Sequence, residues 1–331
     1  MFNSILQHRF FLPVITYVSI IVAMIFWGFS YVWTNIAMRT FPVLTLLELR
    51  LTIATILLFT FGYSFHFMQR PKREDIKWFL LMALFEPFMY FIGETYGLTR
   101  VSPTMASVII STIPLFAPIV AYFLLKERVA WTNIAGIVLS VGGVIAIVSA
   151  HQYEAKRTDG IGLILLALAI ISAIFYSVVL KKLSAHYNGI TLVGYQNLIG
   201  LFFFLPLFLG FDTPKLSHLV LRADSVISVL MLALFASFIA FVLFAEAVRR
   251  IGVVRSNVFC NLMPAVTALF SALILHEILS FQQIIGIAIV IGGLFVSQLQ
   301  VRKHNQAIVC KPNACATDTI QNRTTESTNI K

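Results

Sequence analysis

The chain has 331 residues, of which 59% are hydrophobic and 11% charged, with a mean hydropathy of +0.90 and a formal net charge of +10. A soluble globular protein carries about a quarter charged residues, so this composition excludes that class and predicts an all-α polytopic membrane protein. The positive charge does not require nucleic acid, because the basic residues cluster in short breaks between apolar runs, where they set membrane orientation.

Ten apolar runs of membrane-spanning length follow one another along the chain. A helix needs about 20 residues to cross the hydrocarbon core of a bilayer. The predicted spans are 14–38, 43–64, 77–98, 102–125, 130–150, 160–182, 189–210, 224–248, 254–275 and 280–300. A polar tail, 302–331, follows the last span, and its low hydrophobicity predicts disorder.

The basic residues predict the orientation of the chain in the membrane. If the amino terminus is inside, 17 Lys and Arg residues lie in inner segments and 6 in outer loops, with Arg50 inside a span. This asymmetry is the positive-inside pattern, so we expect both termini in the cytoplasm. The expected location is a bacterial inner (plasma) membrane.

A shift of 150 residues aligns the two halves of the chain without gaps. ALFEPFMYF (83–91) falls on ALFASFIAF (233–241), Pro114 falls on Pro264, and the glycine pair 142–143 falls on 292–293. Each half holds five spans, an odd number, so the second half enters the membrane in the opposite orientation. The sequence therefore predicts two inverted five-helix repeats, 1–150 and 151–301, a design that places a transporter's substrate site between its halves.

Several segments carry a resemblance to a known family. They are MIFWGFSYVWTNIAMRTFP with the following LELR (24–50), PLFAPIVAYFLLKERVAWTNIAGIVLSVGGVIAI (114–147) and PAVTALFSALILHEILSFQQIIGIAIVIGGLFVS (264–297). Together they resemble the EamA-type branch of the drug/metabolite transporter superfamily. The resemblance covers about residues 14–300. It implies ten transmembrane helices in two inverted five-helix repeats, and export or exchange of small metabolites such as amino acids.

Two carboxylates, Glu86 and Glu94, interrupt the third span. A charge at the centre of a membrane helix costs at least about 2.5 kcal/mol, so ionisable residues there are candidates for function. The second repeat has Ala236 and Phe244 at the equivalent positions. The shared helical frame therefore does not need the two charges.

Helical geometry predicts how these carboxylates lie. On a regular helix, Glu86 and Glu94 are about 80° apart with Tyr90 between them, so all three can line one cavity. Pro87 removes a backbone donor and predicts a kink. The functional interpretation is that the carboxylates bind a substrate amine or carry a coupling proton. The alternatives are a structural ion pair with Arg50 and a protonated carboxyl bonded to a backbone carbonyl.

Spans one and two add further candidates. Arg50 is the one basic residue inside a predicted span, and it either holds a substrate carboxylate or balances the carboxylates of the fold. Glu48 precedes it by two residues and so points to nearly the opposite side of the helix. Trp27 and Tyr31 are four residues apart in span one, where aromatic rings either stack on a substrate or pack the core.

The second half contributes Asn257 and Asn261, four residues apart on one face of the ninth span. Amides at such positions either bind a substrate or hold membrane helices together. The glycine pairs at 142–143 and 292–293 permit close helix approach, either within one subunit or in a homodimer.

These features predict a secondary transporter that exports or exchanges small amphipathic metabolites, amino acids or related amines, by alternating access. Protons are the candidate coupling ion. An uncoupled facilitator and a multidrug exporter are the alternatives, followed by a nonenzymatic membrane interaction protein. The sequence has no HExxH motif, and we expect neither enzymatic activity nor a cofactor. The expected partners are a small-molecule substrate and membrane lipid; the substrate's identity and the direction of transport stay open.

Overall fold

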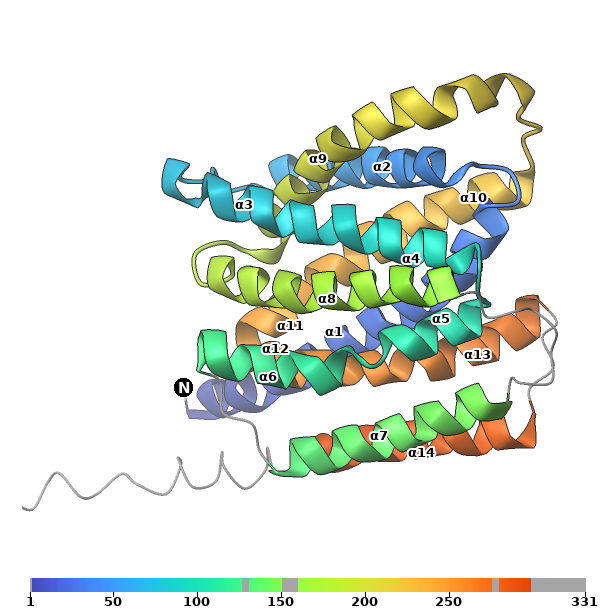
Figure 1. Ribbon diagram of the computed structural model, residues 1–331. Coiled ribbons are helices and arrows are strands. Elements are labelled where there is room, and N and C mark those ends of the chain that lie inside the picture. Colours follow the sequence, from blue (N-terminus) through green and yellow to red (C-terminus); the bar gives the residue numbers. More distant parts are fainter. Residues whose placement is uncertain (1, 127–130, 151–159, 276–279, 299–331) are drawn as a thin grey trace, which may run out of the picture.

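The computed structural model describes residues 2–126, 131–150, 160–275 and 280–298, and each regular element in these ranges is a helix (Figure 1). Backbone polar groups in lipid must bond within their own segment, which explains why long apolar runs become helices. The helices are α1 (Phe2–Ala37), α2 (Val43–Ser64), η1 (Arg73–Asp75), α3 (Ile76–Ala83), η2 (Leu84–Met89), α4 (Tyr90–Leu98), α5 (Pro103–Ile110), α6 (Ile113–Leu125), α7 (Trp131–Ala150), α8 (Gly160–Leu183), α9 (Gly189–Leu207), η4 (Phe208–Asp212), η5 (Thr213–His218), α10 (Ala223–Met231), η6 (Leu232–Ala240), α11 (Phe241–Ile251), α12 (Val253–Val258), η7 (Phe259–Asn261), α13 (Leu262–Ile274) and α14 (Phe281–Gln298).

Eight stretches of the described chain are long and apolar enough to cross a membrane. They are Val14–Ala37, Val43–Ser64, Arg73–Leu98, Pro103–Leu125, Gly160–Leu183, Gly189–Leu216, Ala223–Ile251 and Val253–Ile274, and each overlaps a predicted span. The predicted fifth and tenth spans fall on α7 and α14, whose described apolar stretches, Ile134–Gly143 and Ile284–Gly293, are shorter. The predicted tail, 302–331, lies outside the described residues.

Helices α7 and α14 lie side by side at one edge of the bundle, next to α13 (Figure 1). A Cβ atom added to Gly293 would lie 2.7 Å from the carbonyl oxygen of Gly136 and from the amide nitrogen of Ser140. This glycine therefore allows α14 to approach α7 within one chain. Gly142 and Gly292 have open space around them, so homodimer formation through these helices stays a prediction.

Two wide helical turns occur at corresponding places in the two halves. The π-helical segment η2 begins at Leu84, and the π-helical segment η6, Leu232–Ala240, contains Leu234, which lies 150 residues further on. In η2 the chain leaves helical geometry at Glu86 (φ −145°, ψ 121°), and the Glu86–Pro87 peptide bond is cis. The kink predicted at Pro87 is confirmed. Single π-helical turns inside α-helices are frequent at functional sites.

The wide turn η6 exposes backbone carbonyl groups that other helices satisfy. The indole Nε1 of Trp27 in α1 donates to the carbonyl oxygen of Ala236 at 3.2 Å. The amide nitrogen Nδ2 of Asn197 in α9 donates to the carbonyl oxygen of Ser237, also at 3.2 Å. Because an unpaired buried carbonyl is costly, these two side chains stabilise the irregular segment.

The amino terminus of α2 is capped by a side chain from the other half of the chain. Helix α2 begins after Pro42, which supplies no side-chain cap. Instead, Asp212 of η4 accepts hydrogen bonds from the Thr45 amide at 3.0 Å and from the Thr45 hydroxyl at 3.3 Å. Lys215 donates to the other oxygen of Asp212 at 2.8 Å. A carboxylate at a helix amino terminus satisfies orphan amides and complements the helix dipole.

At the opposite end, the loop after α2 is bonded to the loop between α8 and α9. The Tyr187 hydroxyl donates to Asp75 at 2.7 Å and accepts from the Lys72 amide at 2.9 Å. The Asn188 amide donates to the side chain of Gln69 at 2.9 Å. Burial raises the pKa of the Tyr187 hydroxyl, so it stays protonated and donates at neutral pH.

Candidate functional site

A cavity lies near the middle of the bundle. Its walls come from both halves of the chain: α1, α2, η2, α4, α5 and α6 from the first, and α8, α11, α12, η7 and α13 from the second. The polar or titratable residues that line it are Ser30, Tyr31, Arg50, Glu86, Tyr90, Glu94, Tyr176, Ser177, Asn257 and Cys260.

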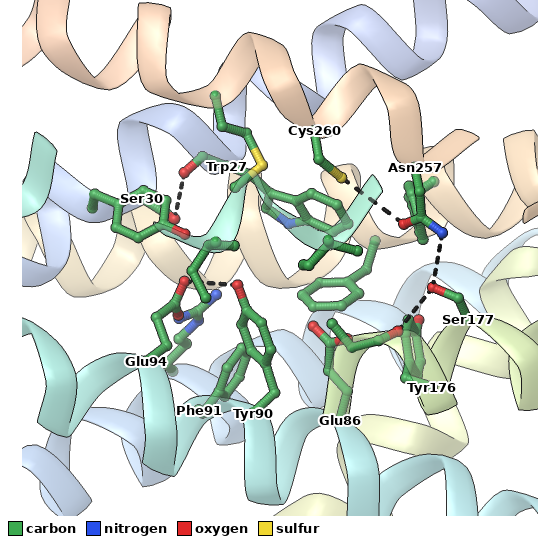
Figure 2. Close-up of a pocket in the computed structure, with 18 residues that line it drawn as sticks. Trp27, Ser30, Glu86, Tyr90, Phe91, Glu94, Tyr176, Ser177, Asn257 and Cys260 are labelled. Atoms are coloured by element: carbon green, nitrogen blue, oxygen red, sulfur yellow. Dashed lines mark hydrogen bonds between the residues drawn. The ribbon is translucent and has the colours of Figure 1, made fainter. Parts of the chain in front are cut away.

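The two predicted carboxylates both line this cavity, and Tyr90 lies with them (Figure 2). Glu86 and Glu94 are each 5% exposed. The Tyr90 hydroxyl donates to Glu94 Oε1 at 3.0 Å. Within the described residues, the Glu86 side chain has no hydrogen bond or ion pair. One carboxylate is therefore held in place by a neighbour, and the other is free to bind a ligand.

The interruption at Glu86 changes the geometry expected from a regular helix. Because Glu86 has extended backbone angles and stands inside a wide turn, the predicted 80° separation from Glu94 does not apply. The two carboxylates still reach the same cavity, since Glu94 lies on the regular helix α4 that follows the turn.

Arg50 approaches the carboxylates from α2 and is 3% exposed. Its Nε donates to the Ser237 hydroxyl, and its guanidinium carbon lies 4.1 Å from the centre of the Phe91 ring. No ion pair within 4.0 Å joins it to Glu86 or Glu94 in the described chain. The contacts that the structure gives the guanidinium are therefore Ser237 and Phe91, and a structural role of Arg50 beside the carboxylates stays a prediction. Glu48 does not line the cavity, as its two-residue offset from Arg50 predicted.

Aromatic side chains form the apolar wall of the cavity. The Trp27 ring lies 5.0 Å from the rings of Phe241 and Phe244, measured between centroids. Its hydrogen bond to Ala236 fixes the orientation of the indole. Tyr31 also lines the cavity, is 1% exposed, and has a hydroxyl with no hydrogen-bond partner in the described residues.

The structure separates the two predicted asparagines. Asn257 lines the cavity, and its Nδ2 donates to the Ser177 hydroxyl at 3.3 Å (Figure 2). Asn261 is buried but does not line the cavity, and its amide has no hydrogen-bond partner in the described chain. The 3₁₀ turn η7, Phe259–Asn261, begins between the two residues and interrupts the regular helix on which the prediction of a shared face depends. Such a turn has three residues per turn, so a four-residue spacing no longer aligns side chains.

Sequence reasoning missed several lining residues. Ser177 and Cys260 lie beside Asn257 at one side of the cavity (Figure 2), while Phe241, Phe244 and Met263 supply apolar contacts. The sequence signal for the first of these is the polar pair Tyr176–Ser177 in the middle of the largely apolar α8. The phenylalanines carry no such signal in a chain with 30 of them.

Comparisons with known proteins identify the family of this chain. The model of the EamA-like transporter family matches residues 14–149 and again residues 160–299. The chain belongs to the EamA-like transporter family. It is accordingly an integral membrane protein of a family of transporters, which implies a small-molecule substrate.

Relatives of this EamA-like chain cover most of its length. It is similar to the uncharacterized transporter YetK of Bacillus subtilis (strain 168), with 30% identity over 87% of this chain and 88% of that protein. It is also similar to a probable terminal-alkyne amino-acid exporter of Streptantibioticus cattleyicolor, with 26% identity over 84% and 91%. A crystal structure with 18% identity covers 86% of this chain and 98% of its own, with a TM-score of 0.71. That last likeness concerns the fold alone.

Proposed function

We propose that this EamA-like protein is a secondary transporter that exports or exchanges amino acids or related amines by alternating access. The observation that carries the proposal is the pair of buried carboxylates, Glu86 and Glu94, which lines a cavity built from both halves of the chain. Intramembrane carboxylates are expensive, and in transporters they mark substrate and ion pathways.

The same proposal includes ten membrane spans in two inverted five-helix repeats, with α7 and α14 as the fifth and tenth spans. Three observations support it. The family model matches the chain twice in tandem. The wide turns η2 and η6 lie about 150 residues apart in the sequence. The helix breaks that precede α6 and α13 are separated by about the same number of residues. A substrate cavity between such repeats opens to one side and then to the other when the halves rock.

The chemistry of the cavity supports an amine or a zwitterion as cargo. It carries two carboxylates and one guanidinium, together with an aromatic wall around Trp27. Carboxylates and aromatic faces both attract ammonium groups. The similarity to a probable terminal-alkyne amino-acid exporter agrees with this class of substrate. We further propose that protons are the coupling ion, bound by the same carboxylates.

The test is to overproduce the protein in a bacterial host and to profile metabolites in the medium. Wild type is compared with an empty vector and with the Glu86→Gln and Glu94→Gln variants at matched membrane abundance. Glu48→Gln is the matched control, because Glu48 is a buried intramembrane carboxylate outside the cavity.

We expect specific metabolites to accumulate with wild type and Glu48→Gln, and not with the two cavity variants. Equal export by all four forms would show that the cavity carboxylates are structural. Collapse of the proton gradient distinguishes coupling mechanisms: it stops accumulation against a gradient by a proton-coupled carrier and leaves an uncoupled facilitator unaffected.

A further inference from the structure

The cavity contains two oppositely charged groups whose hydrogen-bonding capacity is unused. A guanidinium has five N–H donors. In Arg50, Nε is bonded to Ser237, and the four N–H groups of the terminal nitrogens have no acceptor in the described residues. The Glu86 carboxylate likewise has no donor there. Both side chains are at least 95% buried, and both line the same cavity.

These two groups do not satisfy each other. They are farther apart than the 4.0 Å that defines an ion pair. Buried charges are costly unless they are paired and hydrogen-bonded. Glu94 differs from Glu86 because it already accepts a hydrogen bond from Tyr90. The cavity wall therefore carries one guanidinium and one carboxylate, and neither forms an ion pair within 4.0 Å in the described residues.

We propose that the cavity binds an α-amino acid zwitterion with an apolar side chain, which rests on the transport function proposed above. The terminal nitrogens of Arg50 hold the substrate carboxylate, and the Glu86 carboxylate accepts the substrate ammonium. A guanidinium binds a carboxylate through two parallel N–H bonds, which fixes the orientation of the bound group. The aromatic wall of Trp27, Phe241 and Phe244 then receives the apolar side chain.

The contacts of Arg50 orient its guanidinium group for this role. Its Nε bond to Ser237 and its position over the Phe91 ring fix the guanidinium plane without occupying the terminal nitrogens. Trp27 is fixed in the same way by its bond to Ala236. A ligand that carries one charge leaves either Arg50 or Glu86 unpaired, so the site binds the zwitterion more tightly than simple amines and simple acids of the same shape.

The experiment compares three ligands that share one side chain: L-leucine, L-leucinamide and 4-methylpentanoate, with the corresponding phenylalanine series run in parallel. Binding to the purified full-length protein in detergent is measured as ligand-dependent thermal stabilisation. A Cys310→Ser/Cys315→Ser form retains Cys260 as its one thiol. Protection of Cys260 from N-ethylmaleimide then shows whether the ligand occupies the cavity, because Cys260 lines it.

We expect the zwitterion to bind at least about tenfold more tightly than either single-charge analogue, because each analogue leaves a buried charge unpaired. Glu86→Gln should abolish the preference for leucine over 4-methylpentanoate, which lacks the ammonium group. Arg50→Gln should abolish the preference for leucine over leucinamide, which lacks the carboxylate. Arg50→Lys keeps the charge without the planar fork and should retain part of the preference, which guards against misfolding of the glutamine variant. Glu48→Gln should bind as wild type does.

Equal binding of leucine and leucinamide, with no change in Arg50→Gln, would show that Arg50 is structural and would overturn the proposal. Absence of binding by both zwitterions would overturn it as well. The transport function can fail independently of this proposal. Metabolite export without a preference for the zwitterion would support the transporter and contradict the roles of Arg50 and Glu86. Zwitterion binding without any export would support those roles and contradict the transport function.

Discussion

The contact between α1 and α13 beside the cavity predicts a strong response to one added methyl group. Gly28 follows the cavity residue Trp27, and its carbonyl accepts a hydrogen bond from the Thr267 hydroxyl at 2.9 Å. A Cβ atom at position 28 would lie 2.6 Å from Val266 Cγ1, 2.7 Å from Val266 Cβ and 3.2 Å from the carbonyl oxygen of Met263. Gly28→Ala must therefore push the two helices apart.

The size of the effect follows from these distances. Carbon atoms in contact lie about 3.5–4.0 Å apart, so the helices must separate by roughly 1 Å. Val266 cannot rotate away, because a β-branched side chain in a helix has one strongly preferred rotamer. Overpacking of this kind costs about 1–3 kcal/mol. The better helix propensity of alanine offsets about 1 kcal/mol of this cost, which leaves a net loss of free energy of unfolding of roughly 0–2 kcal/mol.

The measurement is the free energy of unfolding from an SDS titration in mixed micelles. Gly142→Ala is the control, since nothing lies within 4 Å of a Cβ added there, and it should be neutral or stabilising. Val266→Gly removes both of the nearest atoms, so the cost of Gly28→Ala should shrink in that background. An equal effect of Gly28→Ala with and without the Val266 side chain would refute the close contact.

Three further perturbations test other parts of the fold. Trp27→Phe removes the donor to the Ala236 carbonyl and should lower the free energy of unfolding by about 1–3 kcal/mol, because a buried acceptor is left unpaired. Asp212→Ala removes the cap on the Thr45 amide and should cost about 0.5–2 kcal/mol in the same titration. Tyr187→Phe removes both bonds of its hydroxyl and should speed hydrogen exchange in the loop after α2.

Each of these predictions has its own control. Trp33→Phe should have a smaller effect than Trp27→Phe, because the Trp33 indole has no hydrogen bond in the described residues. Asp212→Asn keeps a hydrogen-bond acceptor and should lower the free energy of unfolding less than Asp212→Ala does. Tyr63→Phe, at an exposed position, should leave exchange unchanged. Equal effects within any of these pairs would contradict the contact assigned to it.

Hydropathy and spacing predicted much of the architecture because lipid permits few alternatives. Eight predicted spans overlap helices long enough to cross the membrane, since apolar runs of this length have no other way to satisfy their backbone. The positions of Glu86, Glu94 and Arg50 as cavity residues could also be predicted. Ionisable side chains inside spans must point away from lipid, whatever the details of packing.

Local irregularity explains where the predictions failed. Asn257 lines the cavity and Asn261 does not; a 3₁₀ turn begins between them, whereas helical spacing rules assume a regular helix. The hydrogen-bond partner of Arg50 could not be predicted, because Ser237 lies 187 residues away in the chain. Phe244 was identified only as the repeat equivalent of Glu94. Its place in the cavity wall was not predicted, since one phenylalanine among 30 carries no signal by itself.

The sequence by itself determined the membrane class, the helical architecture and which charges must be shielded from lipid, because these follow from the cost of exposing polar groups to hydrocarbon. The tertiary structure alone decided which of those charges are already paired and which face the cavity unpaired. Glu94 has a partner because the regular helix α4 places the Tyr90 hydroxyl 3.0 Å from it, whereas Glu86 lies at the break before that helix. Arg50 takes its partner, Ser237, from the other half of the chain.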